Sequence, residues 1–341
     1  MLDIAPLELR QVREWREVTR ATFDREIEPR HEPALLRGVV ADWPIIGSTR
    51  ESTDALRAYL ARLDSGIKVR AFVGASEMRG RFFYNSAFDG FNFSQVEGDF
   101  QQLLTAIVES HGSRYIYLGS TPTAQLLPEF AGANPLPLVH GKPAEPRVWI
   151  GTDSVIAPHF DESDNIACVV SGKRRFTLFP PEQVSNLYVG PIDNTMAGQP
   201  ASMVELDDPD LDRFPRFGEA LKHALAAELE PGDAIYIPAL WWHGVKAMGP
   251  LNVLINYWWH DTPADAGSPM VAIAEALLSI SPLPDHKRQG WRHMFNHFVF
   301  RPGDDDPAAH IPAQARGVLG RSTPELRRTL REFIIRALGG R

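Results

Sequence analysis

Cysteine is almost absent from this sequence: Cys168 is the only one among 341 residues, which excludes an intrachain disulfide. A lone thiol suits a reducing compartment, so we expect the protein to be cytoplasmic. Long hydrophobic runs are missing too, since no stretch reaches the roughly 18 apolar residues needed to span a bilayer. The N-terminus alternates apolar and charged residues and has no apolar run after a basic start. We therefore predict neither a signal peptide nor a membrane anchor.

The sequence also has little clustered positive charge. Its formal net charge is −8, and its longest basic run is the triplet Lys173, Arg174 and Arg175. Proteins that bind nucleic acid usually present a broad basic surface, so we expect no nucleic-acid partner. With 44% hydrophobic and 23% charged residues, the composition is that of a soluble globular protein that buries a large core.

The chain before Arg147 mixes helical and extended patterns. Apolar residues near helical spacing predict an amphipathic helix over residues 6–25. The other elements predicted in this part are an extended stretch over 34–40, helices over 53–63 and 100–110, a strand and loop over 81–93, and a strand over 114–119.

Between Arg147 and His260 the pattern changes to short strands separated by turns. Strands without intervening helices indicate an antiparallel sandwich or barrel and argue against alternating βαβ units. Residues 182–229 interrupt these strands as a long insertion rich in proline and aspartate, which ends in a short helix over 218–228. An insertion of this length in a barrel is commonly a lid or a binding loop.

The chain turns helical again after Pro263, with helices predicted over 271–279, 290–298 and 322–339. The predicted fold class is therefore mainly β with flanking helices. We expect one catalytic domain over 1–262 and a C-terminal helical region over 263–341.

Two histidines and one aspartate form the strongest chemical signal. His159 and Asp161 lie two residues apart beside a strand, and His243 lies on a later strand of the same β region. Two imidazoles and a carboxylate on three corners of a metal form the facial triad of non-haem iron(II) sites. Strand alternation assigns all three to inward faces. The alternative is a core histidine that donates to a backbone carbonyl, which is common for one histidine and less so for three ionisable groups.

Arg174 is the second informative residue, because it alternates with Phe176 and Leu178 on an apolar strand. An inward guanidinium needs a partner, and arginine forks well onto a carboxylate. A dicarboxylate cosubstrate would supply one. Two alternatives stay open, namely a structural pair with a carboxylate of the protein and a bulge that turns Arg174 outward.

Three further polar residues are candidates for the same pocket. Asn165 shares a face with the predicted metal ligands, and Asn256 shares one with Leu254 and Trp258. Inward amides must be hydrogen-bonded, so they either hold a ligand or cap a neighbouring strand. Tyr117 can place a phenol in the core, where simple packing is the usual role.

Several segments together resemble the cupin-like JmjC family, which includes the asparaginyl hydroxylase of hypoxia-inducible factor. The segments are EPALLRGVVADWP, YIYLGS, HFDESDNIACVVSGKRRFTLFPPEQ, PGDAIYIPALWWHGV and VLINYWW, in the family's order. The resemblance implies a double-stranded β-helix (jelly-roll, cupin) core and an Fe(II)- and 2-oxoglutarate-dependent oxygenase that hydroxylates a C–H bond, most simply on a protein side chain, and releases succinate and CO2. It places iron(II) at His159, Asp161 and His243 and 2-oxoglutarate against Tyr117, Asn165 and Asn256. It also suggests a homodimer through the C-terminal helices.

The chain departs from the family's pattern at two positions. Arg174 stands where many relatives have lysine, and Ile156 stands where a hydroxyl residue is usual. Arginine at position 174 keeps the positive charge, and isoleucine at position 156 loses one hydrogen bond to the cosubstrate. Two N–H groups of the Arg174 guanidinium would therefore have to hold the distal carboxylate of the cosubstrate. The rival hypotheses are a catalytically silent binding module and a metal-dependent cupin that does not use 2-oxoglutarate. Demethylation of an N-methyl group would follow from the same chemistry as hydroxylation.

Overall fold

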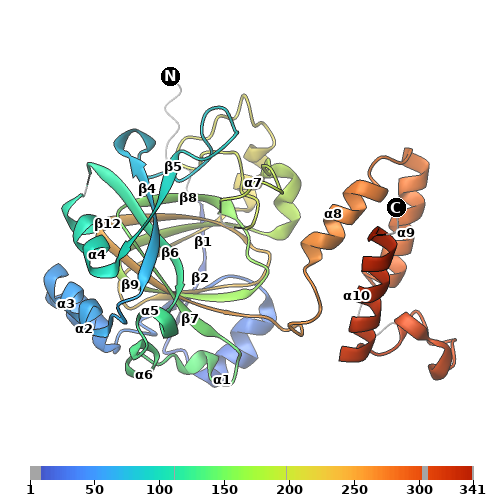
Figure 1. Ribbon diagram of the computed structural model, residues 1–341, viewed down its shortest axis with the longest axis horizontal. Coiled ribbons are helices and arrows are strands. Elements are labelled where there is room, and N and C mark those ends of the chain that lie inside the picture. The colour runs from blue at the N-terminus through green and yellow to red at the C-terminus, as the bar shows by residue number, and fades with distance from the viewer. Residues whose placement is uncertain (1–8, 111, 197, 302–305, 340–341) are drawn as a thin grey trace. The chain divides into compact units, whose positions relative to one another are not determined.

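The structure is a computed structural model that describes residues 9–110, 112–196, 198–301 and 306–339 (Figure 1). Its contacts divide the chain into two compact units, residues 1–260 and 261–341. The first unit contains the sheet and the second is helical. No helix among the described residues is long and apolar enough to cross a membrane.

The first unit is built around a twelve-stranded sheet. Nine strands follow one another across it in the order β2-β3-β11-β9-β12-β7-β6-β4-β5, while β10 pairs with β9 and β1, and β8 pairs with β12. The strands are β1 (Arg10–Gln11), β2 (Arg13–Arg16), β3 (Ala34–Arg37), β4 (Lys68–Ala75), β5 (Phe93–Asp99), β6 (Arg114–Pro122), β7 (Glu145–Gly151), β8 (Ser154–His159), β9 (Asp164–Phe179), β10 (Leu225–Leu229), β11 (Ala234–Ile237) and β12 (Trp242–Trp259).

The two long strands, β9 and β12, divide the sheet into two layers. The start of β9 pairs with β11 and its end pairs with β10, while the start of β12 pairs with β8 and its end pairs with β7. The change of partners falls where the β9–β12 ladder is interrupted, between Met248 and Val253. Gly172 lies in β9 at this interruption with φ +75°, and a Cβ there would overlap Asn252 Oδ1. Only glycine fits at this position, where strands β9 and β12 cross from one layer to the other.

Side chains of the two strands alternate between two cores. Ile166 and Cys168 belong to a core that lies between the sheet and three helices, whereas Ala167 and Val169 face the opposite way. The second core also contains Phe176 from the other half of β9, so the two layers face each other across it. This is the predicted jelly-roll core with flanking helices, and the prediction of the fold class is confirmed.

The helices α2 (Pro44–Glu51), α3 (Thr53–Leu63) and α4 (Phe100–Glu109) cover the outer face of the larger layer (Figure 1). Each buries one apolar face in the first core, as their amphipathic pattern requires. Shorter helical segments of the first unit are α1 (Arg20–Thr22), η1 (Phe23–Ile27), η2 (Glu28–Arg30), η3 (Ser76–Met78), α5 (Thr123–Leu126), α6 (Phe130–Ala133), η4 (Pro137–Val139), η5 (Pro181–Asn186) and α7 (Phe217–His223).

The amphipathic helix expected over residues 6–25 is wrong for its described part. Strands β1 and β2 occupy 10–16, and only the last residues are helical. The cause is tertiary, because β2 finds a parallel partner in β3, where Trp15 lies opposite Leu36, and β1 finds one in β10. The helix expected over 218–228 is half right: α7 ends at His223, and β10 then pairs with β9.

The second unit contains α8 (Pro269–Ser279), α9 (Asp285–Phe298), η6 (Ala313–Ala315), η7 (Gly317–Leu319) and α10 (Pro324–Gly339). Its three longer helices agree with the sequence prediction. No residue of α8, α9 or α10 is buried, although each carries exposed large hydrophobic side chains. These helices therefore present apolar surface that their own unit does not cover.

Candidate metal centre

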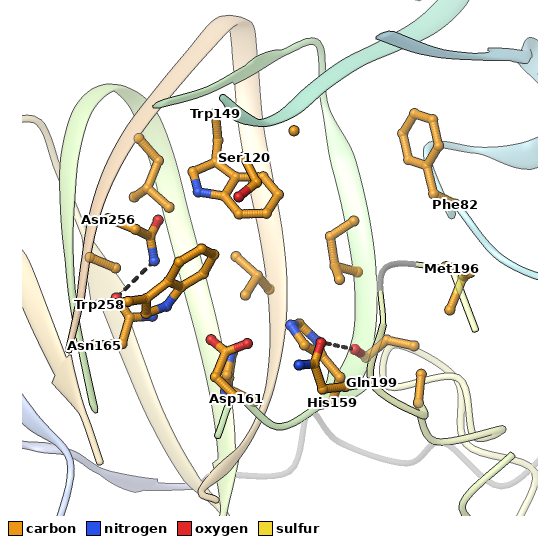
Figure 2. A pocket seen from close by; sticks show the side chains of 18 of the residues that line it. Phe82, Ser120, Trp149, His159, Asp161, Asn165, Met196, Gln199, Asn256 and Trp258 are labelled. Carbon is orange, nitrogen blue, oxygen red and sulfur yellow. Dashed lines mark hydrogen bonds and ion pairs between the residues drawn. The ribbon is translucent and has the colours of Figure 1, made fainter. Parts of the chain in front are cut away.

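A cavity of about 560 Å³ lies on the inner faces of the two layers (Figure 2). Its walls contain His159, Asp161, His243, Arg174, Tyr117, Asn165 and Asn256. All seven residues singled out from the sequence therefore line one cavity. Strand alternation brings six of them there, because their side chains project from strands that border the second core.

The three expected metal ligands lie at adjoining ends of strands. His159 ends β8, Asp161 lies in the turn before β9, and His243 is the second residue of β12. One donor atom from each falls within 4.8 Å of the other two. The His243 Nε2 and Asp161 Oδ2 atoms are 3.7 Å apart, and the two imidazole centroids are 4.5 Å apart. These three residues could therefore hold one metal ion on a single side.

Backbone hydrogen bonds orient both imidazoles. His159 Nδ1 lies 3.0 Å from the Ala157 carbonyl oxygen, and His243 Nδ1 lies 2.9 Å from that of Trp241. A carbonyl oxygen accepts, so the proton of each ring is on Nδ1 and the lone pair is on Nε2. Outer hydrogen bonds of this kind fix the ring orientation of metal-binding histidines.

The electrostatics of the site favour neutral imidazole. The pKa of His243 is lowered to about 4, chiefly by burial and also by the neighbouring His159, while Asp161 opposes both effects. His243 is therefore uncharged near pH 7 before any ion arrives. Neutral imidazole is the form that binds a metal, so binding at this residue requires no proton release.

Arg174 is a buried cation on the wall of the same cavity, with only 3% of its surface exposed. Its Nε atom has no hydrogen-bond partner, and no carboxylate of the described residues forms an ion pair with it. The pKa of Arg174 is lowered to about 10, because the effect of burial outweighs the opposing effect of the nearby Tyr117. The guanidinium is still charged at pH 7, so the cavity contains a desolvated positive charge without a counter-ion from the described chain.

Three more polar residues, Asn165, Asn256 and Tyr117, line the cavity wall with Arg174. The Asn256 Nδ2 atom donates to Asn165 Oδ1 at 2.8 Å, as Figure 2 shows, and the Asn256 Oδ1 atom is buried without a partner. Burial raises the pKa of Tyr117 to about 12, which keeps its phenol protonated. The two amides therefore satisfy one hydrogen bond between themselves. The Asn256 Oδ1 acceptor and the Tyr117 hydroxyl stay available to a ligand in the cavity.

Aromatic residues complete the cavity and were mostly missed from the sequence. Trp149 and Trp258 lie edge to face at 5.8 Å between ring centroids, and each has a buried Nε1 atom without a partner. Trp258 shares the face of Asn256, so alternation could have assigned it to the pocket. Phe82 comes from the 81–93 segment and Met196 from the 182–229 insertion, and no sequence signal placed either at the site (Figure 2). Trp241, two residues before His243, is not among the residues that line the cavity: it packs beside the second core and donates to the His31 carbonyl oxygen.

Residues of the 182–229 insertion form part of the cavity wall, as expected for a lid. Ala201 forms an isolated bridge with His159, and Met196 and Gln199 line the cavity (Figure 2). This placement supports the role expected for the insertion, which covers the metal-ligand side of the cavity.

Residues 20–265 match the family model of the cupin-like domain, and the chain belongs to this family, in its JmjC-type branch. The resemblance drawn from the sequence motifs is confirmed. The chain is 37% identical over 116 residues to human HSPB1-associated protein 1, covering 33% of this chain and 23% of that one. It is 38% identical over 101 residues to the lysine-specific demethylase JMJ31 of Arabidopsis thaliana (30% and 18%) and 32% identical over 145 residues to the mouse tRNA wybutosine-synthesizing protein 5 (38% and 43%). The aligned segments span less than half the length of these relatives.

Proposed function

We propose that the protein is an iron(II)- and 2-oxoglutarate-dependent oxygenase. One observation carries the proposal: a two-histidine, one-carboxylate group and an unpaired buried arginine line the same cavity. The first group suits iron(II), because it occupies one side of the metal and leaves positions open for a cosubstrate and dioxygen. The buried arginine suits a dicarboxylate that would bind the metal at one end and place its other carboxylate against the guanidinium.

The residues around Arg174 fit 2-oxoglutarate in charge and hydrogen bonding. The guanidinium would donate two N–H bonds to the distal carboxylate as a forked pair, and the Tyr117 phenol is protonated and available to donate a hydrogen bond. The Asn165–Asn256 pair would orient the middle of the ligand. An arginine at this position replaces the usual lysine and compensates for Ile156, which offers no hydrogen bond.

The bound iron and 2-oxoglutarate would supply the oxidising chemistry, with succinate and CO2 as coproducts. The chain would contribute positioning and exclusion of water. His159 and His243 present Nε2 to the metal because their Nδ1 atoms are engaged with backbone carbonyls. Trp149, Trp258 and Phe82 line the cavity with apolar surface, and the insertion covers its metal side.

The substrate that this arrangement favours is a protein side chain. The insertion covers the metal-ligand side of the cavity, so an exposed side chain can enter beside it while its own backbone stays outside. Hydroxylation of a C–H bond is the reaction we propose, and the same site would demethylate an N-methyl group. The relatives' names include both a lysine-specific demethylase and a tRNA wybutosine-synthesizing protein. The net charge of −8 argues against RNA for this chain.

The test is iron-dependent turnover of 2-oxoglutarate to succinate, measured for the full chain with and without a peptide pool. Asp161→Ala should abolish succinate formation, and Gln102→Ala, a change at an exposed position of α4, should leave it intact. If iron binds but succinate never forms, the protein is a binding module or a cupin that works without 2-oxoglutarate.

We also propose that the helical unit makes the protein a homodimer. Its longer helices expose Val271, Leu278, Phe333, Ile335 and other large apolar side chains. A second copy presents the same surface, and a two-fold interface buries one such patch against another. Sedimentation of the full chain tests this directly.

A further inference from the structure

A second cavity, of about 350 Å³, adjoins the first beside β4 and β6. The two cavities share Phe72, Gly119 and Ser120 on their walls. The second is otherwise lined by residues of β4, β5 and β6 and by the segment after β6, namely Ile67, Lys68, Val69, Arg70, Gln95, Thr121, Pro122 and Gln125. A ligand that occupies the metal cavity can therefore continue across the shared residues into the second cavity.

The second cavity lies where β4 and β6 part. Their antiparallel ladder runs from Ala75 opposite Arg114 to Phe72 opposite Tyr117 and stops there, although both strands continue. Residues 68–71 of β4 pair only with β5, and their other edge has no backbone partner among the described residues. Backbone groups of a strand alternate between its two edges, so every second residue of this stretch leaves its N–H and C=O open to the cavity while the others bond β5.

A β-bulge in β6 accounts for this separation. Gly119 and Ser120 both lie opposite the single residue Trp149 of β7, and Ser120 has φ +45°. Arg147 fixes the bulge, since its Nε donates to Ser120 Oγ at 2.7 Å and its Nη2 donates to the Ser120 carbonyl oxygen at 2.6 Å. Bulges bend a strand and end its pairing, and they are frequent beside active sites. The bulge turns β6 away from β4 at the boundary between the two cavities.

The opening has a definite length. Beyond it the two segments meet again, where the Ser65 backbone N–H donates to the Leu126 carbonyl oxygen at 3.0 Å and the Ser65 hydroxyl donates to the Gln125 carbonyl oxygen at 2.6 Å. Four strand residues lie between the two closures, which corresponds to about 13 Å of extended chain. A short extended segment fits this edge, whereas a long strand does not.

The charged side chains that line the second cavity favour a polypeptide ligand over a nucleic acid. Lys68 Nζ lies 2.8 Å from Asp99 Oδ1, and Arg70 Nε lies 3.5 Å from Glu97 Oε2, so both cations that line the cavity are paired across β4 and β5. Binding of a nucleic acid gains much of its affinity from cations that contact phosphates, and both cations here are engaged with carboxylates. A polypeptide backbone needs only the hydrogen-bonding edge that residues 68–71 provide.

We propose that a polypeptide substrate docks in extended conformation against the open edge of β4, in the second cavity, and enters the metal cavity over Gly119 and Ser120. This inference rests on the proposed function, because it names the substrate of that site. Backbone pairing would supply affinity with little dependence on side chains, and Phe72 at the junction would contact the residue next to the oxidised one.

The experiment uses the full chain and peptides selected for binding from a pool of random 12-residue sequences. Gln125→Trp, which fills the second cavity, should weaken binding of the selected peptides at least tenfold. Gln102→Trp, a matched change on the exposed face of α4, should alter it less than twofold. Methylation of alternate backbone nitrogens in the peptide should weaken binding to a similar extent, because it removes the donors that pair with β4. Hydrogen exchange on the unaltered chain should show new protection, when a peptide is bound, at those amides of residues 68–71 that point away from β5.

Three results would overturn the proposal. Equal binding of the selected peptides to the two tryptophan variants would show that they dock elsewhere. A pool that yields no binder would exclude a polypeptide as the ligand of this cavity. Tighter binding of random 12-nucleotide RNA than of the peptides would show that the ligand is a nucleic acid. The proposed function is measured separately, as the binding of iron(II) and 2-oxoglutarate to Gln125→Trp. Loss of peptide binding with cosubstrate binding intact supports this site, and failure of cosubstrate binding in the unaltered chain refutes the oxygenase proposal alone.

Discussion

Replacement of Arg174 by methionine should have opposite effects on cosubstrate binding and on folding. Methionine keeps much of the length of the side chain and removes the charge. If the guanidinium holds a carboxylate of 2-oxoglutarate, its loss removes one partner of a buried charged pair, which typically costs about 2–5 kcal/mol. At 1.36 kcal/mol per tenfold change, we expect affinity for 2-oxoglutarate to fall by about 30- to 5,000-fold.

The ligand-free protein should not lose stability from the same change. Burial lowers the pKa of Arg174 from its ordinary value to about 10, so the folded state disfavours the cation by about 3 kcal/mol. Because the shifted group is a base with a lowered pKa, this penalty is fully present below pH 10 and disappears only as the pH rises through the ordinary pKa of an arginine. At pH 7 Arg174→Met should therefore leave the free energy of unfolding unchanged or raise it by up to about 3 kcal/mol.

Calorimetric titration with 2-oxoglutarate and urea unfolding of the metal-free chain measure the two effects. Arg174→Lys is the matched control, since it keeps the charge without the fork and should bind 2-oxoglutarate with intermediate affinity. A structural ion pair would give the reverse pattern: Arg174→Met would destabilise the fold by about 3–5 kcal/mol and leave cosubstrate affinity unchanged. That result would refute the role assigned to this residue.

Other predictions concern separate parts of the molecule. Gly172→Ala should destabilise the fold by more than about 2 kcal/mol in urea unfolding, because the φ of Gly172 is positive and a Cβ would overlap a neighbour. The control Gly47→Ala, at a position of α2 with open space around it, should be neutral or stabilise the fold by about 0.5–1 kcal/mol. Equal effects of the two substitutions would contradict the strand crossing described above. Asn256→Ala should weaken 2-oxoglutarate binding by about 1–2 kcal/mol in calorimetry, and unchanged affinity would remove the amide pair from the site. Ile335→Glu should convert a dimer to a monomer in sedimentation, and Thr329→Glu on the same helix should not; a single-chain mass for the unaltered protein would reject the dimer.

Alternation along strands made much of the inner surface predictable. Arg174, Asn165 and Asn256 were assigned to the inward face from parity with apolar neighbours, and all three side chains are buried on the cavity wall. Parity survives because the strands are long and each has one face in an apolar core. Their roles as ligands of 2-oxoglutarate stay predictions.

Features that depend on tertiary partners were not predictable in the same way. The segment around Trp15 has apolar spacing that suits a helix, and it became a strand because β3 offered a free edge. The pocket residues Phe82 and Met196 come from loops whose positions depend on packing between distant segments. The bulge at Ser120 follows from an αL conformation that serine rarely adopts, so nothing in its sequence indicated the second cavity. The cytoplasmic location also stays a prediction.

The most direct test of the central claim is an anaerobic titration of the metal-free chain with iron(II) and then 2-oxoglutarate, followed by visible absorbance. A weak metal-to-ligand charge-transfer band that is absent from His159→Ala and strongly weakened in Arg174→Met is the predicted result, since one residue would hold the metal and the other the cosubstrate. Iron binding without such a band would contradict the 2-oxoglutarate assignment and leave a metal-dependent cupin of another kind.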